Sequence, residues 1–204
     1  MDFLSAIKSI AGEECIFCNE MMSDHTTFKV GGPAKYFVVP YRAEDIKKYI
    51  LAAEEYKIPY YVIGNGSNLL VSDKGYDGMI IMLGRDLGNI TVNGDMITAE
   101  AGTSLARLFN TARRHSLSGL EFAAGIPGTL GGACYMNAGA YGGEMKDVLT
   151  KVVTIDRQGN THEYKQGEME LSYRNSIFIR KQEIILSAEM KLCKGDVEEM
   201  THKV

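Results

Sequence analysis

Hydrophobic residues recur every three or four positions in three stretches of the chain, a spacing that predicts helices with one buried face. The first helix is expected over residues 2–22, where Phe3 and Ile7 begin an apolar stripe. The second is expected over 43–57 (AEDIKKYILAAEEYK) and the third over 103–115 (TSLARLFNTARRH). Between these helices the pattern changes to short apolar or alternating runs, which are typical of strands.

Two of the strand-like runs flank the second helix, AKYFVVP (34–40) before it and YYVIG (60–64) after it. A strand, a helix and a strand in succession predict a βαβ unit with parallel strands. After Gly64 the segment LLVSD (69–73) also has the pattern of a strand.

Beyond Gly78 the strand pattern is that of hairpins. MIIML (79–83) is followed by NITVNGDMITAEA (89–101), in which Asn93-Gly94 is a strong two-residue turn signal. KVVTIDRQGNTHEYK (151–165) predicts a second hairpin, and QEIILSAEMKL (182–192) predicts a late strand. Antiparallel strands are therefore expected to dominate the second half of the chain.

These elements predict an α+β fold in two lobes. The expected divisions are an N-terminal helix at 1–22, a small βαβ lobe at 23–76, a larger lobe at 77–196, and the opening of another helix at 197–204. No repeat or low-complexity linker separates the lobes.

Composition places the chain among ordinary soluble globular proteins, with 45% hydrophobic and 24% charged residues. A net charge of −4 argues against nucleic acid or an anionic membrane as a partner. No run approaches the ~20 apolar residues of a membrane span, so a cytoplasmic protein is expected. Cys15 and Cys18 form a lone CxxC without a second ligand pair, and no metal site is expected.

The stretch at 125–143, GIPGTLGGACYMNAGAYGG, has seven glycines among nineteen residues and contains no acidic or basic residue. Ile126-Pro127-Gly128 predicts a turn, and Thr129 is expected to begin a short helix whose first amides face an anion. Glycine inside such a helix costs about 1 kcal/mol relative to alanine. Two explanations stay open, close helix packing and a ligand that lies directly against the backbone.

A second candidate site is the loop Gly64-Asn65-Gly66-Ser67-Asn68, which follows a predicted buried strand. Consecutive amides in a glycine-containing turn form a concave anion site, and Ser67 adds a hydroxyl donor. The loop lacks the lysine of a phosphate-binding P-loop and the third glycine of a dinucleotide fingerprint. A plain turn between strands remains the alternative. Two glycine-rich turns, one in each lobe, suit a ligand that carries two phosphates.

Four segments in this order resemble the UDP-N-acetylenolpyruvoylglucosamine reductases, flavoenzymes of peptidoglycan precursor synthesis. The segments are HTTFKVGGPA (25–34), VIGNGSNLLVSDKGYDGMII (62–81), GLEFAAGIPGTLGGACYMNAGAYGGEMKDV (119–148) and SYRNSIF (172–178). The resemblance covers almost the whole chain from Asn19 onward. It implies a two-lobed FAD-binding domain of the vanillyl-alcohol-oxidase (PCMH) type, with FAD between the lobes.

The resemblance also implies the residues of the site. FAD would be bound by Gly64, Asn65, Gly66, Ser67 and Asn68 in the first lobe, and in the second by Gly125, Ile126, Pro127, Gly128, Thr129, Gly131, Gly132, Ala133, Asn137, Gly139, Ala140 and Tyr141. The substrate would be bound by Tyr173, Arg174 and Asn175. Covalent flavin attachment in this superfamily uses a histidine in the diphosphate loop, and 62–71 has none, so the FAD is expected to be non-covalent.

By the same resemblance Arg174 is the catalytic cation. NADPH would reduce FAD, and hydride would then pass to UDP-N-acetylglucosamine enolpyruvate, giving UDP-N-acetylmuramate; a fixed cation stabilises the enolate that forms. The family's proton donor is a serine in an AGS-F-K-like segment of a further substrate domain, assisted by a later glutamate. Neither segment is in this sequence. We therefore expect this chain to be a fragment that binds FAD and does not turn over, with 197–204 opening the linking helix.

Two other functions remain open from the sequence. One is a stand-alone flavin-binding module without chemistry, and the other is a different FAD-dependent oxidase of the same superfamily. The SYRNS segment favours the reductase, because its arginine has a role only where an anionic intermediate must be stabilised.

Overall fold

The computed structural model of the protein describes residues 2–202. The chain divides into two compact units, which are described separately. The first comprises residues 1–87 together with 157–160, and the second comprises 88–156 and 161–204. The segment 157–160 is the turn of a hairpin whose two strands belong to the second unit.

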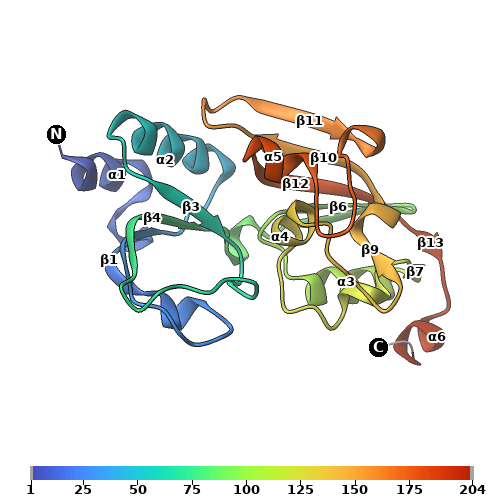
Figure 1. Cartoon of the computed structure of the whole chain (residues 1–204). Helices are drawn as coiled ribbons and strands as arrows, with labels where there is room; N and C mark the ends of the chain where they lie inside the picture. Colours follow the sequence, from blue (N-terminus) through green and yellow to red (C-terminus); the bar gives the residue numbers. More distant parts are fainter. Residues whose placement is uncertain (1, 203–204) are drawn as a thin grey trace. The chain divides into compact units, whose positions relative to one another are not determined.

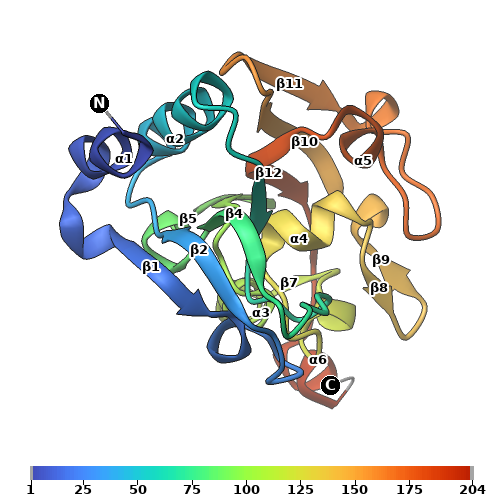
Figure 2. The same ribbon diagram turned by 60° about the vertical axis from the view of Figure 1, so that its left-hand side comes forward.

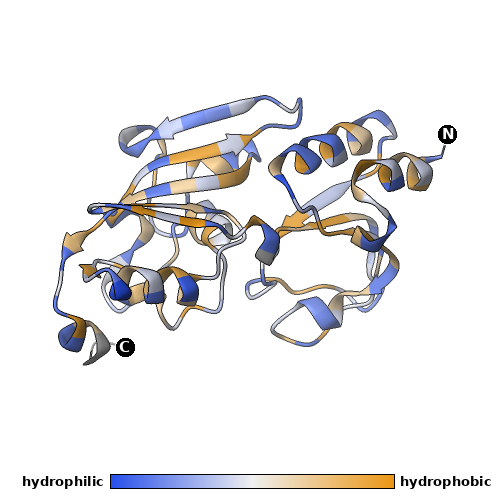
Figure 3. Ribbon diagram, turned by 180° about the vertical axis from the view of Figure 1, so that it is seen from behind, coloured by the Kyte–Doolittle hydropathy of each residue, from blue (hydrophilic) through white to orange (hydrophobic). Residues whose placement is uncertain are grey.

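The first unit is a four-stranded sheet with two helices. Its elements are α1 (Phe3–Ala11), η1 (Glu13–Cys15), β1 (Ile16–Met21), η2 (Met22–His25), β2 (Pro33–Val38), α2 (Ala43–Glu55), β3 (Tyr60–Ile63), β4 (Tyr76–Met82) and η3 (Arg85–Leu87). The strand order is β1-β2-β4-β3, and α1 and α2 pack side by side (Figure 1). Helix ribbons in this unit carry both hydrophilic and hydrophobic colours, as the amphipathic pattern predicts (Figure 3).

The predicted helix over residues 2–22 is wrong in its second half. The helix α1 ends at Ala11, because Gly12 follows with a φ of +91°, a conformation that breaks the helix. Residues Ile16–Met21 instead form β1, antiparallel to β2 with Phe17 opposite Phe37. The chain reaches its first strand inside the segment that the apolar stripe had assigned to a helix.

The predicted βαβ unit is present, but its two strands are not neighbours. Both β2 and β3 are parallel to β4, which lies between them, with Val38 opposite Ile81 and Val62 also opposite Ile81. The MIIML strand was expected in the second lobe, and this expectation is wrong because β4 completes the first sheet. The predicted LLVSD strand is also wrong: 69–73 is irregular, and Val71 packs beside Gly31 without a ladder.

The helix α2 buries one face against the rest of the first unit. Tyr49 is fully buried on this face, with Ile46 and Ile50 beside it in the helix. The Tyr49 hydroxyl has no hydrogen-bond partner among the residues that the structure describes. Burial raises the pKa of this phenol above its usual value, because the phenolate form would lose its hydration.

Replacing Tyr49 with phenylalanine is expected to stabilise the first unit by about 1 kcal/mol near neutral pH, because an unpaired buried hydroxyl is removed. The pKa of Tyr49 is raised in the folded state, so the wild type loses stability as the pH rises past the unfolded value near 10. The advantage of Tyr49→Phe should therefore grow with alkalinity. Urea unfolding at pH 8 and pH 10.5 measures both effects, and identical pH slopes for the two proteins would contradict the second.

The second unit is built on a five-stranded antiparallel sheet with strand order β11-β10-β12-β6-β5 (Figure 2). The strands of the whole second unit, including those of two small two-stranded sheets, are β5 (Ile90–Asn93), β6 (Met96–Glu100), β7 (Leu117–Ser118), β8 (Gly139–Ala140), β9 (Gly143–Glu144), β10 (Leu149–Ile155), β11 (Thr161–Lys165), β12 (Ile184–Lys191) and β13 (Cys193–Lys194). Its helices are α3 (Leu105–Arg114), η4 (Glu121–Ala123), α4 (Leu130–Tyr135), η5 (Met145–Asp147), η6 (Gln166–Glu168), α5 (Ile177–Lys181) and α6 (Val197–His202).

Most predictions for the second unit are confirmed at the level of its elements. The Asn93-Gly94 turn joins β5 to β6, with Gly94 at a φ of +61°. Ser104 caps α3 by accepting a hydrogen bond from the amide of Arg107 at 3.3 Å. The second predicted hairpin is β10–β11, and the late strand is β12.

The short helix α4 packs against β12 and β6, which places the glycine-rich stretch on the sheet of the second unit (Figure 2). The small hairpin β8–β9 follows it directly, and η5 leads from that hairpin into β10. Among the described residues, no helix has the length and apolar character that crossing a membrane requires.

Candidate functional site

The predicted site residues are divided between the units. The loop 64–68 lies in the first unit, after β3, and all the other predicted residues lie in the second. No group of three or more histidine, cysteine, aspartate or glutamate side chains suited to a metal ion occurs among the described residues.

The loop 64–68 is held against the segment that precedes β2. Gly66 is buried at a φ of +61°, and a Cβ there would lie 2.0 Å from the carbonyl oxygen of His25. Its own carbonyl accepts a hydrogen bond from the amide of Thr27 at 3.3 Å. Glycine is therefore required at 66 by the fold itself, which brings HTTFK and GNGSN side by side. Asn65 and Asn68 remain exposed on the outer side of the loop.

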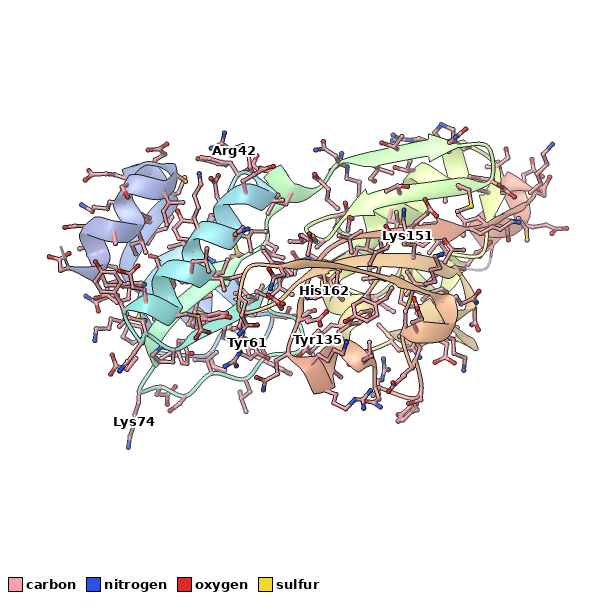
Figure 4. The ribbon with its side chains drawn as sticks, turned by 90° about the horizontal axis from the view of Figure 1, so that it is seen from above. Arg42, Tyr61, Lys74, Tyr135, Lys151 and His162 are labelled. Carbon is pink, nitrogen blue, oxygen red and sulfur yellow. The ribbon has the colours of Figure 1, made fainter. Side chains whose placement is uncertain are left out.

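No helix follows this loop, so its glycines do not form the dinucleotide-binding fingerprint, which opens a helix. The chain continues as an irregular segment that carries the exposed Lys74 on its outer side (Figure 4) and enters β4 at Tyr76. An anion at this loop would be bound by turn amides and by the Ser67 hydroxyl rather than by a helix.

Two adjacent glycines in α4 have different physical roles. A Cβ on Gly131 would lie 2.8 Å from the Ala101 Cβ, so this glycine allows α4 to approach the end of β6 closely. A Cβ on Gly132 would meet only the Thr129 hydroxyl, at 3.8 Å, and this residue is exposed between buried neighbours. Packing explains Gly131, and nothing within the described protein requires glycine at 132.

The expectation that the first amides of α4 face an anion is wrong for two of them. The amide of Leu130 donates to the carbonyl of Thr103 at 2.8 Å, and that of Gly131 donates to the carbonyl of Ala101 at 2.9 Å. Because α4 has only six residues, these bonds use much of its first turn. The bonds anchor the helix to the β6–α3 connection instead.

The turn before α4 is anchored at one end and open at the other. Gly128 accepts from the amide of Leu105 at 3.0 Å, and Thr129 is buried in an isolated bridge with Ser104. Gly125 is exposed, and a Cβ there would meet no atom within 4 Å. The predicted residues Ile126 and Pro127 lie between these points, while Ala133 is buried one turn further along.

The hairpin β8–β9 carries the remaining predicted cofactor residues. Gly139 pairs with Glu144 and Ala140 with Gly143, which leaves Tyr141 at the tip with a φ of +52°. The Tyr141 side chain is 95% exposed. An exposed aromatic ring held in an uncommon backbone conformation is available to a ligand, but contributes nothing to the core.

The SYRN segment forms a tight turn beside this hairpin. Ser172 and Asn175 exchange backbone hydrogen bonds of 3.1 Å in both directions, and Tyr173 and Arg174 form the exposed tip. Arg174 has a φ of +50°, and its guanidinium donates to the carbonyl of Gly139 at 3.2 Å. Its Cζ lies 5.7 Å from the centre of the Tyr173 ring. The structure thus joins two segments that are far apart in the sequence.

Sequence reasoning missed two side chains that support this region. Glu144 accepts from the Asn137 side chain at 2.7 Å and pairs with Lys146, whose pKa that carboxylate raises. Ser176 is buried and donates to the carbonyl of Tyr135 at 2.5 Å, which fixes the end of the SYRN segment to α4. The contacts of Glu144 with Asn137 and of Ser176 with Tyr135 have no local sequence signal, because each joins residues that only the fold brings together.

An open hollow of about 590 Å³ lies elsewhere on the second unit. It is lined by Lys146, Asp147, Gln166, Gly167, Glu170 and Leu171. None of the predicted site residues lines it, and its walls carry both signs of charge. The candidate site is therefore the glycine-rich surface and not this hollow.

Comparisons with known proteins identify the kind of domain that this chain forms. The family model of the FAD-binding domain matches residues 34–165, which is more than half of the chain. In structure, the chain is similar to alkyldihydroxyacetonephosphate synthase (TM-score 0.71, 17% identity, 94% of this chain and 40% of that one). Such a low identity shows the fold alone. The fold is thus the two-lobed α+β FAD-binding domain of the vanillyl-alcohol-oxidase (PCMH) type.

Relatives of higher sequence identity show to which family within this fold the chain belongs. The chain is 46% identical, over 198 residues, to the UDP-N-acetylenolpyruvoylglucosamine reductase of Caldanaerobacter subterraneus subsp. tengcongensis, covering 97% of this chain and 65% of that protein. It is 42% identical to the reductase of the same name from Alkaliphilus oremlandii, covering 98% of this chain and 67% of the relative. The reductase structure from Thermus caldophilus gives a TM-score of 0.77 at 36% identity, covering 90% of this chain and 65% of that one. The chain belongs to the UDP-N-acetylenolpyruvoylglucosamine reductase family, and it spans about two thirds of the length of these relatives.

The residues present fit a bound FAD. Gly132 on α4 and Gly125 before that helix are exposed, and a side chain at either would occupy space that the described protein leaves open. A flat ring or a diphosphate can approach such backbone directly. In the first unit, loop 64–68 offers turn amides and the Ser67 hydroxyl, the donors that a diphosphate requires.

Proposed function

We propose that this chain carries the FAD site of an enzyme that reduces UDP-N-acetylglucosamine enolpyruvate to UDP-N-acetylmuramate with NADPH, in peptidoglycan precursor synthesis in the cytoplasm. The observation that carries the proposal is the exposed Gly132 on α4, in a chain 46% identical to a named reductase. When bound, FAD supplies hydride transfer between NADPH and the enolpyruvyl group.

In this proposal each segment has a separate task. Loop 64–68 binds the diphosphate, while residues 125–133 and 139–141 present backbone and the Tyr141 ring to the flavin. Tyr173, Arg174 and Asn175 face the substrate, and the Arg174 cation stabilises the negative charge that builds on the substrate's carboxylate side during reduction. The guanidinium already sits at a fixed place, bonded to the Gly139 carbonyl.

We propose that the FAD is bound without a covalent link. His25 lies next to loop 64–68 in the first unit, with its carbonyl facing Gly66. Its ring stacks on Phe37 at a centroid distance of 4.2 Å, and its Nε2 bonds to Glu20 at 2.9 Å, so this ring is held within the first unit. No histidine lies in 62–71.

The test is to purify the chain, add FAD and examine the flavin. A yellow protein that releases its flavin on denaturation is the expected result, whereas a protein that ignores added FAD would contradict the proposal. With NADPH and UDP-N-acetylglucosamine enolpyruvate, this chain alone is expected not to turn over, because the family's serine and glutamate proton donors have no counterpart in its sequence. Measurable product from the chain alone would overturn that part.

A further inference from the structure

The side-chain amide of Asn137 forms hydrogen bonds to other protein groups through both its nitrogen and its oxygen. It is 1% exposed and lies just beyond α4 at a φ of +46°. Its Nδ2 donates to the Glu144 carboxylate at 2.7 Å and to the Ser172 carbonyl at 3.0 Å, and its Oδ1 accepts from the amide of Lys146 at 2.9 Å. Both amide hydrogens are used, which leaves no side-chain donor for a cofactor.

The three bonds also fix which way the amide points. A carboxylate and a carbonyl accept only, and a backbone amide donates only, so exchanging the oxygen and nitrogen of Asn137 would break all three contacts. Glu144 is itself held in place by its ion pair with Lys146 and by the capping interaction with Asp147 at the start of η5. The Asn137 amide is therefore a rigid donor aimed at the base of the 172–175 turn.

Two contacts hold the Arg174 segment, and each involves Asn137 or a residue close to it in the chain. The turn that carries it closes at Ser172, whose carbonyl accepts from Asn137 and from the amide of Asn175. The guanidinium bonds to Gly139, two positions beyond Asn137 in the chain. Arg174 is otherwise exposed and holds an uncommon positive φ. Such a conformation persists only where its surroundings impose it.

We propose that Asn137 is a positioning residue, which holds the 172–175 turn against the β8–β9 hairpin and thereby sets the place of the Arg174 guanidinium. Asn137 does not touch the substrate and is not a flavin ligand through its side chain. The proposal deepens the proposed function, because the catalytic role of Arg174 rests on that function. The positional claim itself concerns only residues of the second unit.

Two variants separate the hydrogen bonds from the backbone conformation. Asn137→Asp keeps the size and the tolerance for positive φ, but it replaces the donor with an oxygen that faces Glu144 and the Ser172 carbonyl. Asn137→Gly removes the side chain and also accepts the positive φ without strain. Thr154→Val is the matched control, since Thr154 is a buried residue of the same unit that donates to Glu183 at 2.5 Å, away from the turn.

The first measurement is hydrogen exchange of the Ser172 and Asn175 amides, which bond across the turn. In both Asn137 variants this exchange is expected to quicken about tenfold at pH 7, the effect of losing one or two hydrogen bonds. The second is the NMR signal of the Arg174 guanidinium, whose hindered rotation reports its bond to Gly139. That signature should be lost in the Asn137 variants and retained in Thr154→Val.

Both measurements are made on the chain without flavin, so they stand whether or not the proposed reductase activity does. If the turn amides and the Arg174 signal are unchanged in Asn137→Asp and Asn137→Gly, the positioning role is refuted. It is equally refuted if Thr154→Val alters them as much, because the effect would then be general loosening of the unit. A chain that ignores added FAD, but in which the turn still responds to Asn137, would refute the proposed function alone.

Discussion

Replacing Gly132 with leucine is expected to abolish flavin retention, with the affinity for FAD lowered about a hundredfold or more. The physical reason is that a Cβ at 132 meets only the Thr129 hydroxyl, at 3.8 Å, so the new side chain extends into the space assigned to the flavin and not into the protein. Flavin absorbance of the purified variant and a titration with FAD measure the loss. Urea unfolding should show the first unit intact.

Gly167 supplies the matched control for that variant. A Cβ at 167 would also meet nothing within 4 Å, and the residue is exposed in η6, outside the predicted site. Gly167→Leu is expected to bind FAD like the wild type. If Gly132→Leu also binds FAD with unchanged affinity, the glycine-rich stretch serves packing only, and the flavin lies elsewhere or is not bound.

The neighbouring substitution should act on the fold instead. Gly131→Leu is expected to destabilise the second unit by about 3 kcal/mol, because its Cβ would already lie 2.8 Å from the Ala101 Cβ and 3.3 Å from the Ala101 carbonyl oxygen. Denaturant unfolding followed by far-UV circular dichroism measures the loss. A stability equal to that of the wild type would mean that α4 can move away from β6 without cost.

A double variant tests whether that one contact is responsible. Gly131→Ala alone introduces the Cβ conflict with Ala101, and adding Ala101→Gly removes it. The two changes are expected to be non-additive, with the pair more stable than the sum of the single effects predicts. Strict additivity would place the constraint on Gly131 somewhere other than Ala101.

The predictions that succeeded depend on signals confined to neighbouring residues. The dipeptide Asn93-Gly94 by itself indicates a two-residue hairpin turn. The apolar face of α3 repeats within ten residues, after the N-cap Ser104. Hairpins and amphipathic helices of this kind carry their pattern locally, so the order of elements in the second unit could be predicted from the sequence.

The failures involve partners that are distant in the sequence. The stripe that began α1 continued past Gly12, and only the pairing of β1 with β2 shows that the chain had become extended. The strand β4 lies between β2 and β3 because of the order in which the strands pair in the sheet, and its own sequence does not indicate this position. A strand-like run in the sequence predicts a strand, but it does not predict which strands pair with it.

The candidate site shows the same division. Composition identified the glycine-rich stretch, but the sequence does not distinguish the roles of the adjacent Gly131 and Gly132. Only the position of Ala101 in the fold shows that Gly131 is required for packing and that Gly132 faces open surface. The resemblance to the reductases implies that Asn137 binds the cofactor. Its partners Ser172 and Glu144, which give it a different role, are brought to it by the fold.

The assignment of residues 157–160 to the first unit has a consequence for biosynthesis. A chain emerging from the ribosome exposes residues 1–87 first, yet this unit lacks part of its own structure until residue 160 has been made. By then most of β5 to β10 has also emerged. The last part of the first unit is therefore synthesised after most of the sheet of the second unit.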